Sequence, residues 1–148
     1  MSLVYTDNLT PEQRKRTMTQ VHSKDTQPEM RVRRLVHSLG YRYRLHRKDL
    51  PGNPDLVFPK RRKIIFVHGC FWHGHDCKAG RKRPKANAEY WSAKLAHNRD
   101  RDVTSQALLR AQGWDVLIVW ECDLKRFDDL TVMIRRFLDD AEEAQQHA

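Results

Sequence analysis

The segment 55–77 combines residue types that few folds need together merely to fold. It runs Asp55-Leu-Val-Phe-Pro-Lys-Arg-Arg-Lys-Ile-Ile-Phe-Val-His68-Gly-Cys70-Phe-Trp-His73-Gly-His75-Asp-Cys77. Carboxylate and imidazole suit metal-assisted phosphate chemistry, thiolates and imidazole suit a structural zinc, and a Phe-Trp pair on a loop suits stacking on bases. We therefore expect the rest of the chain to support this segment.

The charge of the chain indicates a polyanionic partner. Its 148 residues include 28 Lys+Arg against 19 Asp+Glu, a net charge of +9 with neutral histidines, and the pI is near 9.8. Nucleic acid is the first candidate. A membrane surface is the other, but the longest apolar runs, 64–67 and 116–120, are far shorter than the ~20 residues of a spanning helix. With no signal-peptide pattern, we expect a cytoplasmic protein with a single domain over 1–148 and no membrane contact.

Capping signals predict two helices at the start of the chain. Thr10-Pro-Glu-Gln13 predicts a helix to about Val21, inside an N-terminal helical segment of about 1–25. Thr26-Gln-Pro-Glu29 predicts a second helix that ends at Gly40. This helix buries the apolar residues at helical spacing, which are Val32, Leu35, Val36 and Leu39. Glu29 is then either a capping residue or part of an active site.

Alternating patterns and turn residues predict a three-stranded meander. Apolar and basic residues alternate from Tyr41 to His46, a rigid Leu50-Pro-Gly-Asn-Pro54 turn precedes a strand at 56–58, and a basic turn leads into a strand at 63–67. Asp55 at the start of one strand and His68 at the end of its neighbour then lie at the same end of the sheet. They are within reach of a shared ion.

The second half predicts a crossover connection. A long helix begins at Asn87 and ends at Gly113, and its expected buried residues are Tyr90, Leu95, Leu108 and Leu109. The apolar strand 114–120 that follows suits a central position. A last helix, about Asp128 to Ala144, has an acidic tail at about 139–148 with no assigned function. The fold class is α/β, a mixed central sheet flanked by helices.

All three cysteines fit one metal site. Cys70, His75 and Cys77 are close in sequence, and Cys122 directly follows the apolar strand. If that strand lies beside the one ending at His68, the four residues form a closed Cys3His site, which suits a structural Zn2+ that holds the loop. His73 is an alternative ligand to His75. Cysteines buried merely as small hydrophobes are the other interpretation.

An acid and two histidines of this segment fit phosphodiester cleavage. Asp55 offers oxygen ligands to a hard ion such as Mg2+. His68 and His73 have ordinary pKa values near neutrality and can exchange protons with water and a leaving group. An aspartate after proline is often only a turn residue and a single histidine often only a surface residue. Their convergence on one metal-fixed loop favours a catalytic role.

Three strings resemble one enzyme family. They are Leu50-Pro-Gly-Asn-Pro-Asp55, Phe66-Val-His68-Gly-Cys-Phe-Trp-His73 and Val119-Trp-Glu-Cys122, and they resemble the very short patch repair (Vsr) endonucleases, which are bacterial enzymes that nick DNA beside a thymine mispaired with guanine. The likeness extends from Met18 to about Cys122. It implies a restriction-endonuclease-like fold of the PD-(D/E)xK type with a structural zinc site. Pro54-Asp55 is present, and Phe66-Val67-His68 stands where Glu-x-Lys would.

The resemblance implies roles for individual residues. Asp55 and the main-chain carbonyl of Val67 hold magnesium, His73 is the leading candidate for general base, and His68 lies beside the scissile phosphate. Glu29 reaches in from the second helix, and Asp102 orients a histidine. The zinc ligands are Cys70, His75, Cys77 and Cys122. The family often has threonine where this chain has Val67, a change that removes a hydroxyl and keeps the carbonyl.

DNA contacts are expected from aromatic and basic residues. Phe71 and Trp72 lie between zinc ligands and should project from a rigid platform, although aromatics also serve as core filler. The resemblance implies that Phe71, Trp72 and Trp91 wedge into the base stack from the major groove and Met18 from the minor groove, where unstacking is cheapest at a mismatch. The residues expected at phosphates, or merely on a solvated face, are Arg14, Lys15, Arg16, Lys82, Arg83 and Lys85.

The leading hypothesis is a Mg2+-dependent, zinc-stabilised DNA nicking enzyme for T:G mismatches that arise from 5-methylcytosine deamination. One alternative is a non-catalytic zinc-stabilised module that binds distorted duplex. A zinc nucleobase deaminase is disfavoured because the chain lacks the His-x-Glu and Pro-Cys-x-x-Cys signature. The resemblance adds mismatch-repair proteins and a cytosine-5 DNA methyltransferase as partners and a bacterial, nucleoid-associated location. A single-strand nick needs one active site, so we expect a monomer.

Overall fold

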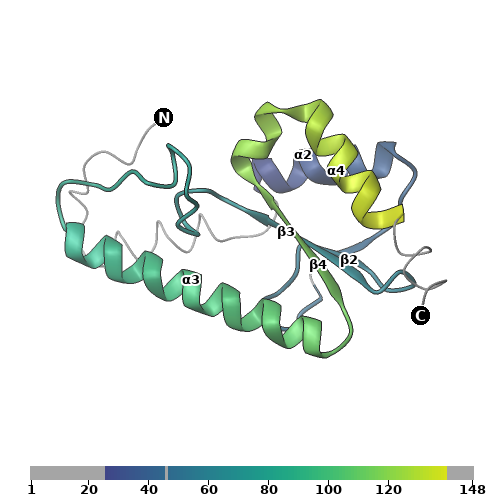
Figure 1. Ribbon diagram of the computed structural model, residues 1–148, viewed down its shortest axis with the longest axis horizontal. Coiled ribbons are helices and arrows are strands. Elements are labelled where there is room, and N and C mark those ends of the chain that lie inside the picture. Colours follow the sequence, from purple (N-terminus) through teal and green to yellow (C-terminus); the bar gives the residue numbers. More distant parts are fainter. Residues whose placement is uncertain (1–25, 46, 140–148) are drawn as a thin grey trace.

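The computed structural model describes residues 26–45 and 47–139, which form three layers. A four-stranded sheet lies between helices α2 and α4 on one face and helix α3 on the other (Figure 1). The elements in chain order are α2 (Gln27–Ser38), β1 (Arg44–Leu45), β2 (Leu56–Phe58), β3 (Lys63–His68), α3 (Ala88–Ala111), β4 (Asp115–Trp120), a 3-10 helix η1 (Glu121–Lys125) and α4 (Phe127–Asp139). The predicted mixed sheet with flanking helices is confirmed.

The sheet order is β1-β2-β3-β4. β1 and β2 are antiparallel, as are β2 and β3, which confirms the predicted meander. β4 returns parallel to β3 through the α3 crossover, and His68 is paired with Trp120. The loop after β3 and the segment after β4 therefore start side by side at one end of the sheet.

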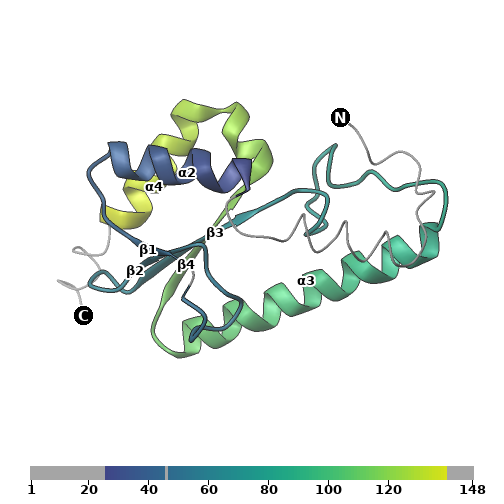
Figure 2. The ribbon, with the colours of Figure 1, turned by 180° about the vertical axis from the view of Figure 1, so that it is seen from behind.

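Each face of the sheet has its own core. Ile65 and Val67 of β3 point toward α2 and α4, whereas Ile64 and Phe66 point toward α3. All six residues of β3 are buried, as expected for a strand covered on both faces. Figure 2 shows the same layers from behind, with α3 beneath the sheet.

The predicted start of α2 is confirmed. Oγ1 of Thr26 accepts a hydrogen bond from the backbone N–H of Glu29 at 3.4 Å, and a proline lies in the first turn. The helix ends at Ser38, and Gly40 has φ +96°, the left-handed conformation that favours glycine after a helix.

Three expectations about the elements are wrong. The strand expected over 41–46 is only the two residues of β1, because pairing with the short strand β2 extends no further. β4 is the last strand of the described sheet and not a central one, since helices cover its two faces and no strand of residues 26–45 or 47–139 pairs with its outer side. Tyr90 and Leu108 are exposed, at 39% and 49%, because they lie off the inner face of α3.

The first predicted helix and the acidic tail at 140–148 lie outside the described residues. Within those residues, no helix is long and apolar enough to cross a membrane.

Candidate active site

A cavity of about 560 Å3 opens at the end of the sheet where β2 begins and β3 ends. Its walls come from the start of α2, the 52–55 turn, the end of β3, the loop after β3 and the middle of α3. Five residues that the sequence predicts for catalysis or magnesium line it together: Glu29, Asp55, Val67, His68 and His73.

Asp55 lies at the start of β2, and its side-chain carboxylate forms a hydrogen bond with β3. Its Oδ2 accepts the backbone N–H of Val67 at 2.6 Å. Burial and the nearby charge of Glu29 raise the pKa of Asp55 well above the usual range, although the Val67 hydrogen bond and Arg33 act in the opposite direction. A divalent cation between the two carboxylates would supply the missing positive charge. The carboxylate oxygens of Asp55 and Glu29 therefore fit Mg2+.

Glu29 forms an ion pair with an arginine one helical turn later. Nη2 of Arg33 donates to Oε2 of Glu29 at 2.8 Å, and both side chains are almost fully buried. The hydrogen bond holds the carboxylate in one position, and loss of either partner would leave an uncompensated buried charge.

His68 and His73 stack face to face. Their ring centroids are 3.7 Å apart with an interplanar angle of 5°. His68 is 5% exposed, and burial, followed by the proximity of His73, lowers its pKa to about 3. His68 is therefore neutral at physiological pH. Its buried Nδ1 has no hydrogen-bond partner among the described residues.

Asp102 of α3 fixes the orientation of His73. Nδ1 of His73 and Oδ2 of Asp102 are 2.5 Å apart. With Nδ1 donating to the carboxylate, Nε2 of His73 carries the lone pair and can accept a proton. The sequence placed Asp102 where it could orient a histidine, and the two residues do meet.

The four cysteine and histidine residues expected at zinc come together beside this cavity. The ligand atoms of Cys70, His75, Cys77 and Cys122 all lie within 4.8 Å of one another. Sγ of Cys122 is 3.6 Å from Nδ1 of His75, close to the ~3.6–3.8 Å edge expected from zinc–ligand bonds of about 2.0–2.3 Å to nitrogen and sulfur. His73 belongs to the other cluster, with His68 and Asp102.

The thiols differ in their readiness to ionise. Burial raises the pKa of Cys70. For Cys77, burial acts upward, but the N–H of Gly80, 3.3 Å from Sγ, and further hydrogen bonds lower the pKa below its ordinary value. Metal binding requires all three as thiolates, so the four residues can hold a closed tetrahedral metal centre.

Phe71, Trp72 and Trp91 form an aromatic cluster next to the cavity. The ring centroids of Phe71 and Trp72 lie 5.0 Å apart, and both rings are edge-to-face with Trp91, at 5.8 and 5.6 Å. Phe71 and Trp72 are half-buried and Trp91 is 4% exposed. Lys82, Arg83 and Lys85 are exposed on the following loop. The expected contacts Arg14, Lys15, Arg16 and Met18 lie outside the described residues.

Sequence reasoning missed two polar residues on the inner face of α3, Asn98 and Ser105. The inward positions follow one helical stripe, which is Trp91, Leu95, Asn98, Asp102, Ser105 and Leu109. Asn98 is fully buried, and its Nδ2 donates to the carbonyl of Trp72 at 2.9 Å, which anchors the loop before His73. The 3-4 spacing was the available signal, because it marks these polar residues as inward-facing. Arg33, four residues after Glu29, was missed in the same way.

Comparison with known proteins identifies the family of this chain. Residues 6–79 match the family model described as DNA mismatch endonuclease Vsr. The chain is 55% identical to the type II nicking enzyme V.XorIIP of Xanthomonas oryzae pv. oryzae, over 90% of this chain and 98% of the relative. This chain belongs to the Vsr endonuclease family.

Two other Vsr relatives extend the comparison. The type II nicking enzyme V.NmeAIP of Neisseria meningitidis is 42% identical over 81% of this chain and 85% of its own length. DNA mismatch endonuclease Vsr of Escherichia coli K12 is 40% identical over 80% of this chain and 75% of its own. As a Vsr family member the protein is a DNA endonuclease, which confirms the predicted enzyme class. The alternative of a non-catalytic DNA-binding module is therefore not supported.

Proposed function

We propose that this Vsr family endonuclease nicks one strand of duplex DNA next to the thymine of a T:G mismatch produced by 5-methylcytosine deamination. The reaction is Mg2+-dependent phosphodiester hydrolysis, and the nick initiates very short patch repair. The observation that carries the proposal is that His73, oriented by Asp102 and stacked on neutral His68, lines the same cavity as Asp55 and Glu29.

The residues predicted for catalysis and magnesium have different roles in this proposal. Asp55 and the main-chain carbonyl of Val67 hold Mg2+, with the carboxylate of Glu29 adding negative charge nearby. With Mg2+ bound there, the site would gain positive charge to offset that of the phosphate and a water of lowered pKa. Nε2 of His73 accepts the proton of the attacking water, and Asp102 stabilises the imidazolium that results. His68 stays neutral and offers its ring beside the scissile phosphate.

The Cys3His cluster binds Zn2+ as a structural ion. Four protein ligands leave no open coordination position, so the zinc takes no part in hydrolysis. It holds the segment from Cys70 to Cys77, which contains Phe71, Trp72 and His73. The position of Asp55 and Val67 on neighbouring antiparallel strands supports a restriction-endonuclease-like core.

The aromatic cluster and the basic residues around it contact the DNA. Phe71 and Trp72, backed by Trp91, wedge into the base stack from one groove and Met18 from the other. Lys82, Arg83, Lys85 and Arg14 neutralise phosphates, which makes the affinity salt-dependent and independent of sequence. A mismatch is selected because it unstacks at the lowest cost.

A nicking assay tests the proposal. A labelled duplex with one T:G pair is incubated with the protein and Mg2+, beside duplexes with each other mismatch and a fully paired duplex. We expect one nick beside the mismatched thymine, lost in Asp55→Ala and His73→Ala while duplex binding persists. Equal nicking of the paired duplex would overturn the mismatch specificity. Nicking that survives Asp55→Ala would overturn the assignment of the metal site.

A further inference from the structure

The catalytic cavity has more acidic than basic side chains. Its carboxylates are those of Glu29, Asp55, Asp102 and Glu121. Arg101 of α3 is the only arginine or lysine among the described residues that line it. A DNA phosphate is itself an anion, so these carboxylates repel it unless positive charge lies beside it. The one cationic side chain on the wall is therefore well placed to act on the phosphate.

Two other cations near this end of the fold are already paired. Arg33 is buried and donates to Glu29 at 2.8 Å. Lys63, the only lysine or arginine of β3, is buried at the far end of the strand, where it pairs with Asp115 at 2.9 Å. Arg101 differs from both, because it is exposed and forms no ion pair with a carboxylate in the described part of the chain.

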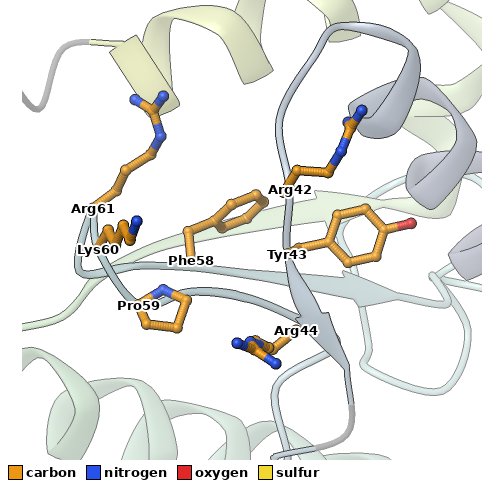
Figure 3. A pocket seen from close by; sticks show the side chains of 7 residues that line it. All are labelled: Arg42, Tyr43, Arg44, Phe58, Pro59, Lys60 and Arg61. Atoms are coloured by element: carbon orange, nitrogen blue, oxygen red, sulfur yellow. The ribbon is translucent and has the colours of Figure 1, made fainter.

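A separate group of cations lies too far from the cavity to serve it. A second pocket, next to the turn between β2 and β3, is lined by Arg42, Arg44, Lys60 and Arg61 (Figure 3). That turn leads into Lys63 at the start of β3, whereas His68 at the end of β3 lines the catalytic cavity. Five steps of ~3.3 Å separate the two ends of the strand by about 17 Å. The cations of the second pocket therefore do not share a phosphate with the catalytic residues.

A hydrogen bond holds Arg101 close to the loop that contains His73. Nη2 of Arg101 donates to Oδ1 of Asn98, one helical turn earlier, at 3.4 Å. Asn98 is fully buried, and its own Nδ2 donates to the carbonyl of Trp72 at 2.9 Å. Asp102, the next residue of α3, bonds to His73 itself. Arg101 and the proposed general base thus belong to one connected part of the cavity wall.

We propose that Arg101 is a catalytic residue of the nicking reaction, whose guanidinium binds a non-bridging oxygen of the scissile phosphate. The planar donors of a guanidinium match phosphate oxygens, and the contact strengthens as negative charge grows on them in the transition state. This role rests on the proposed hydrolysis and adds a residue to it.

Arg101 keeps its protons throughout the reaction. The oxygen of water bonds to phosphorus, and the proton of that water passes to His73. The bond from phosphorus to the leaving sugar oxygen breaks with its electron pair on that oxygen, which then takes a proton from solvent. Arg101 thus contributes charge and hydrogen bonds only.

Substitutions of Arg101 combined with a neutral phosphate test the proposal. Arg101→Gln removes the charge and keeps an amide donor for Asn98, and Arg101→Lys keeps a charge. The matched control is Arg44→Gln, the same change at an exposed arginine of the second pocket. Single-turnover nicking of a T:G duplex is measured with Mg2+. Fluorescence anisotropy without added metal gives Kd for the same duplex and for two versions with one methylphosphonate, either at the position that the wild type nicks or one DNA turn away.

We expect Arg101→Gln to nick about 10²-fold more slowly than the wild type, since one donor to the charged oxygens is lost. Arg101→Lys should recover about tenfold of this loss, and Arg44→Gln should nick within about threefold of the wild type. Without metal, Arg101→Gln should bind the unmodified duplex about fivefold more weakly than the wild type. This difference should disappear when the scissile phosphate is neutral and persist when the distant phosphate is neutral.

Several results would overturn the role of Arg101. Nicking by Arg101→Gln at the wild-type rate is one, and a binding difference that persists with the neutral scissile phosphate is another, because it would place Arg101 at a different phosphate. Equal losses of rate in the glutamine and lysine variants, with a lower Tm in both, would show a structural role through Asn98. A wild-type protein that nicks no duplex would overturn the proposed function itself, and the role of Arg101 with it.

Discussion

Nδ1 of His73 lies 2.5 Å from a carboxylate oxygen of Asp102, although one residue comes from an irregular loop and the other from the middle of a long helix. His73 lines the catalytic cavity, and with Nδ1 bonded to the carboxylate, Nε2 is the ring nitrogen that can accept a proton. Stacking on His68 holds the same ring from one face. Asp102 from α3 and His68 from the end of β3 thus hold one imidazole of the loop after β3.

Asp102→Asn should slow nicking while leaving DNA binding unchanged. The amide is a weaker acceptor and can impose the wrong tautomer on His73, so we expect a decrease of roughly 10²–10⁴-fold in single-turnover rate. Asp100→Asn is the control, since Asp100 is an exposed acid on the same helix. Equal rates in the two variants would show that the carboxylate of Asp102 does not orient the base.

Asp55→Asn should stabilise the protein near neutral pH when no magnesium is added. The folded-state pKa of Asp55 lies above its ordinary value of 3.8. The folded protein therefore retains this proton at a pH where the unfolded chain has lost it. The free energy of unfolding then falls as pH rises from about 3.8 through the raised pKa and stays low above it.

Urea unfolding across this pH range measures the effect. The asparagine variant should lack this pH dependence, because its amide still accepts the Val67 N–H but carries no charge, and its nicking rate should fall by at least about 10²-fold. Asp49→Asn, at an exposed ion pair with Arg47, is the control for removal of a carboxylate. A variant less stable than the wild type at neutral pH would contradict the assigned shift.

Removing zinc should unfold the loop that contains His73. We expect one zinc per chain by elemental analysis and less than one in Cys122→Ser, with a lower Tm by several degrees, because structural zinc binding contributes directly to folding. All cysteines belong to the cluster, so the control is metal replacement: chelator-treated protein should regain its Tm with Zn2+ and not with Mg2+ alone. Recovery with Mg2+ alone would exclude a structural zinc.

Gly52→Ala should destabilise the wall of the catalytic cavity. Gly52 has φ +79°, and a Cβ there would lie 2.8 Å from Cβ of Ser105 on α3. Gly40→Ala is the matched control, with φ +96° and open space around an added Cβ. Both changes cost about 1–2 kcal/mol of backbone strain, and Gly52→Ala should cost a further ~1–3 kcal/mol from overpacking. Similar unfolding free energies for the two variants would show that the contact with Ser105 relaxes.

Local features were predictable because they depend on neighbours in sequence. The Thr26 cap, the meander and the crossover helix all follow from spacing and residue type, and the motif strings identified the family. Asp55 and His68 were expected at one end of the sheet, and both line the cavity. These predictions required only the knowledge of which residues share a strand end or a helix turn.

The interior of the site depended on packing between elements. The register of β3 against β4 could not be predicted from spacing. The pairing of His68 with Trp120 brings Cys122 to Cys70, and the N–H of Cys122 lies 3.4 Å from Sγ of Cys70. Likewise, the rotation of α3 decides that Asn98 and Asp102 face the loop while Leu108 faces solvent.

The sequence by itself determined the family, the chemistry of the side chains and the local elements. Only the tertiary structure decided that β4 closes the described sheet, that Arg33 pairs with Glu29 and that the histidine in contact with Asp102 is His73. The reason is physical: caps and alternation are set by bonds a few residues apart, whereas these contacts arise when helices and strands bury their apolar faces and carry polar residues inward with them.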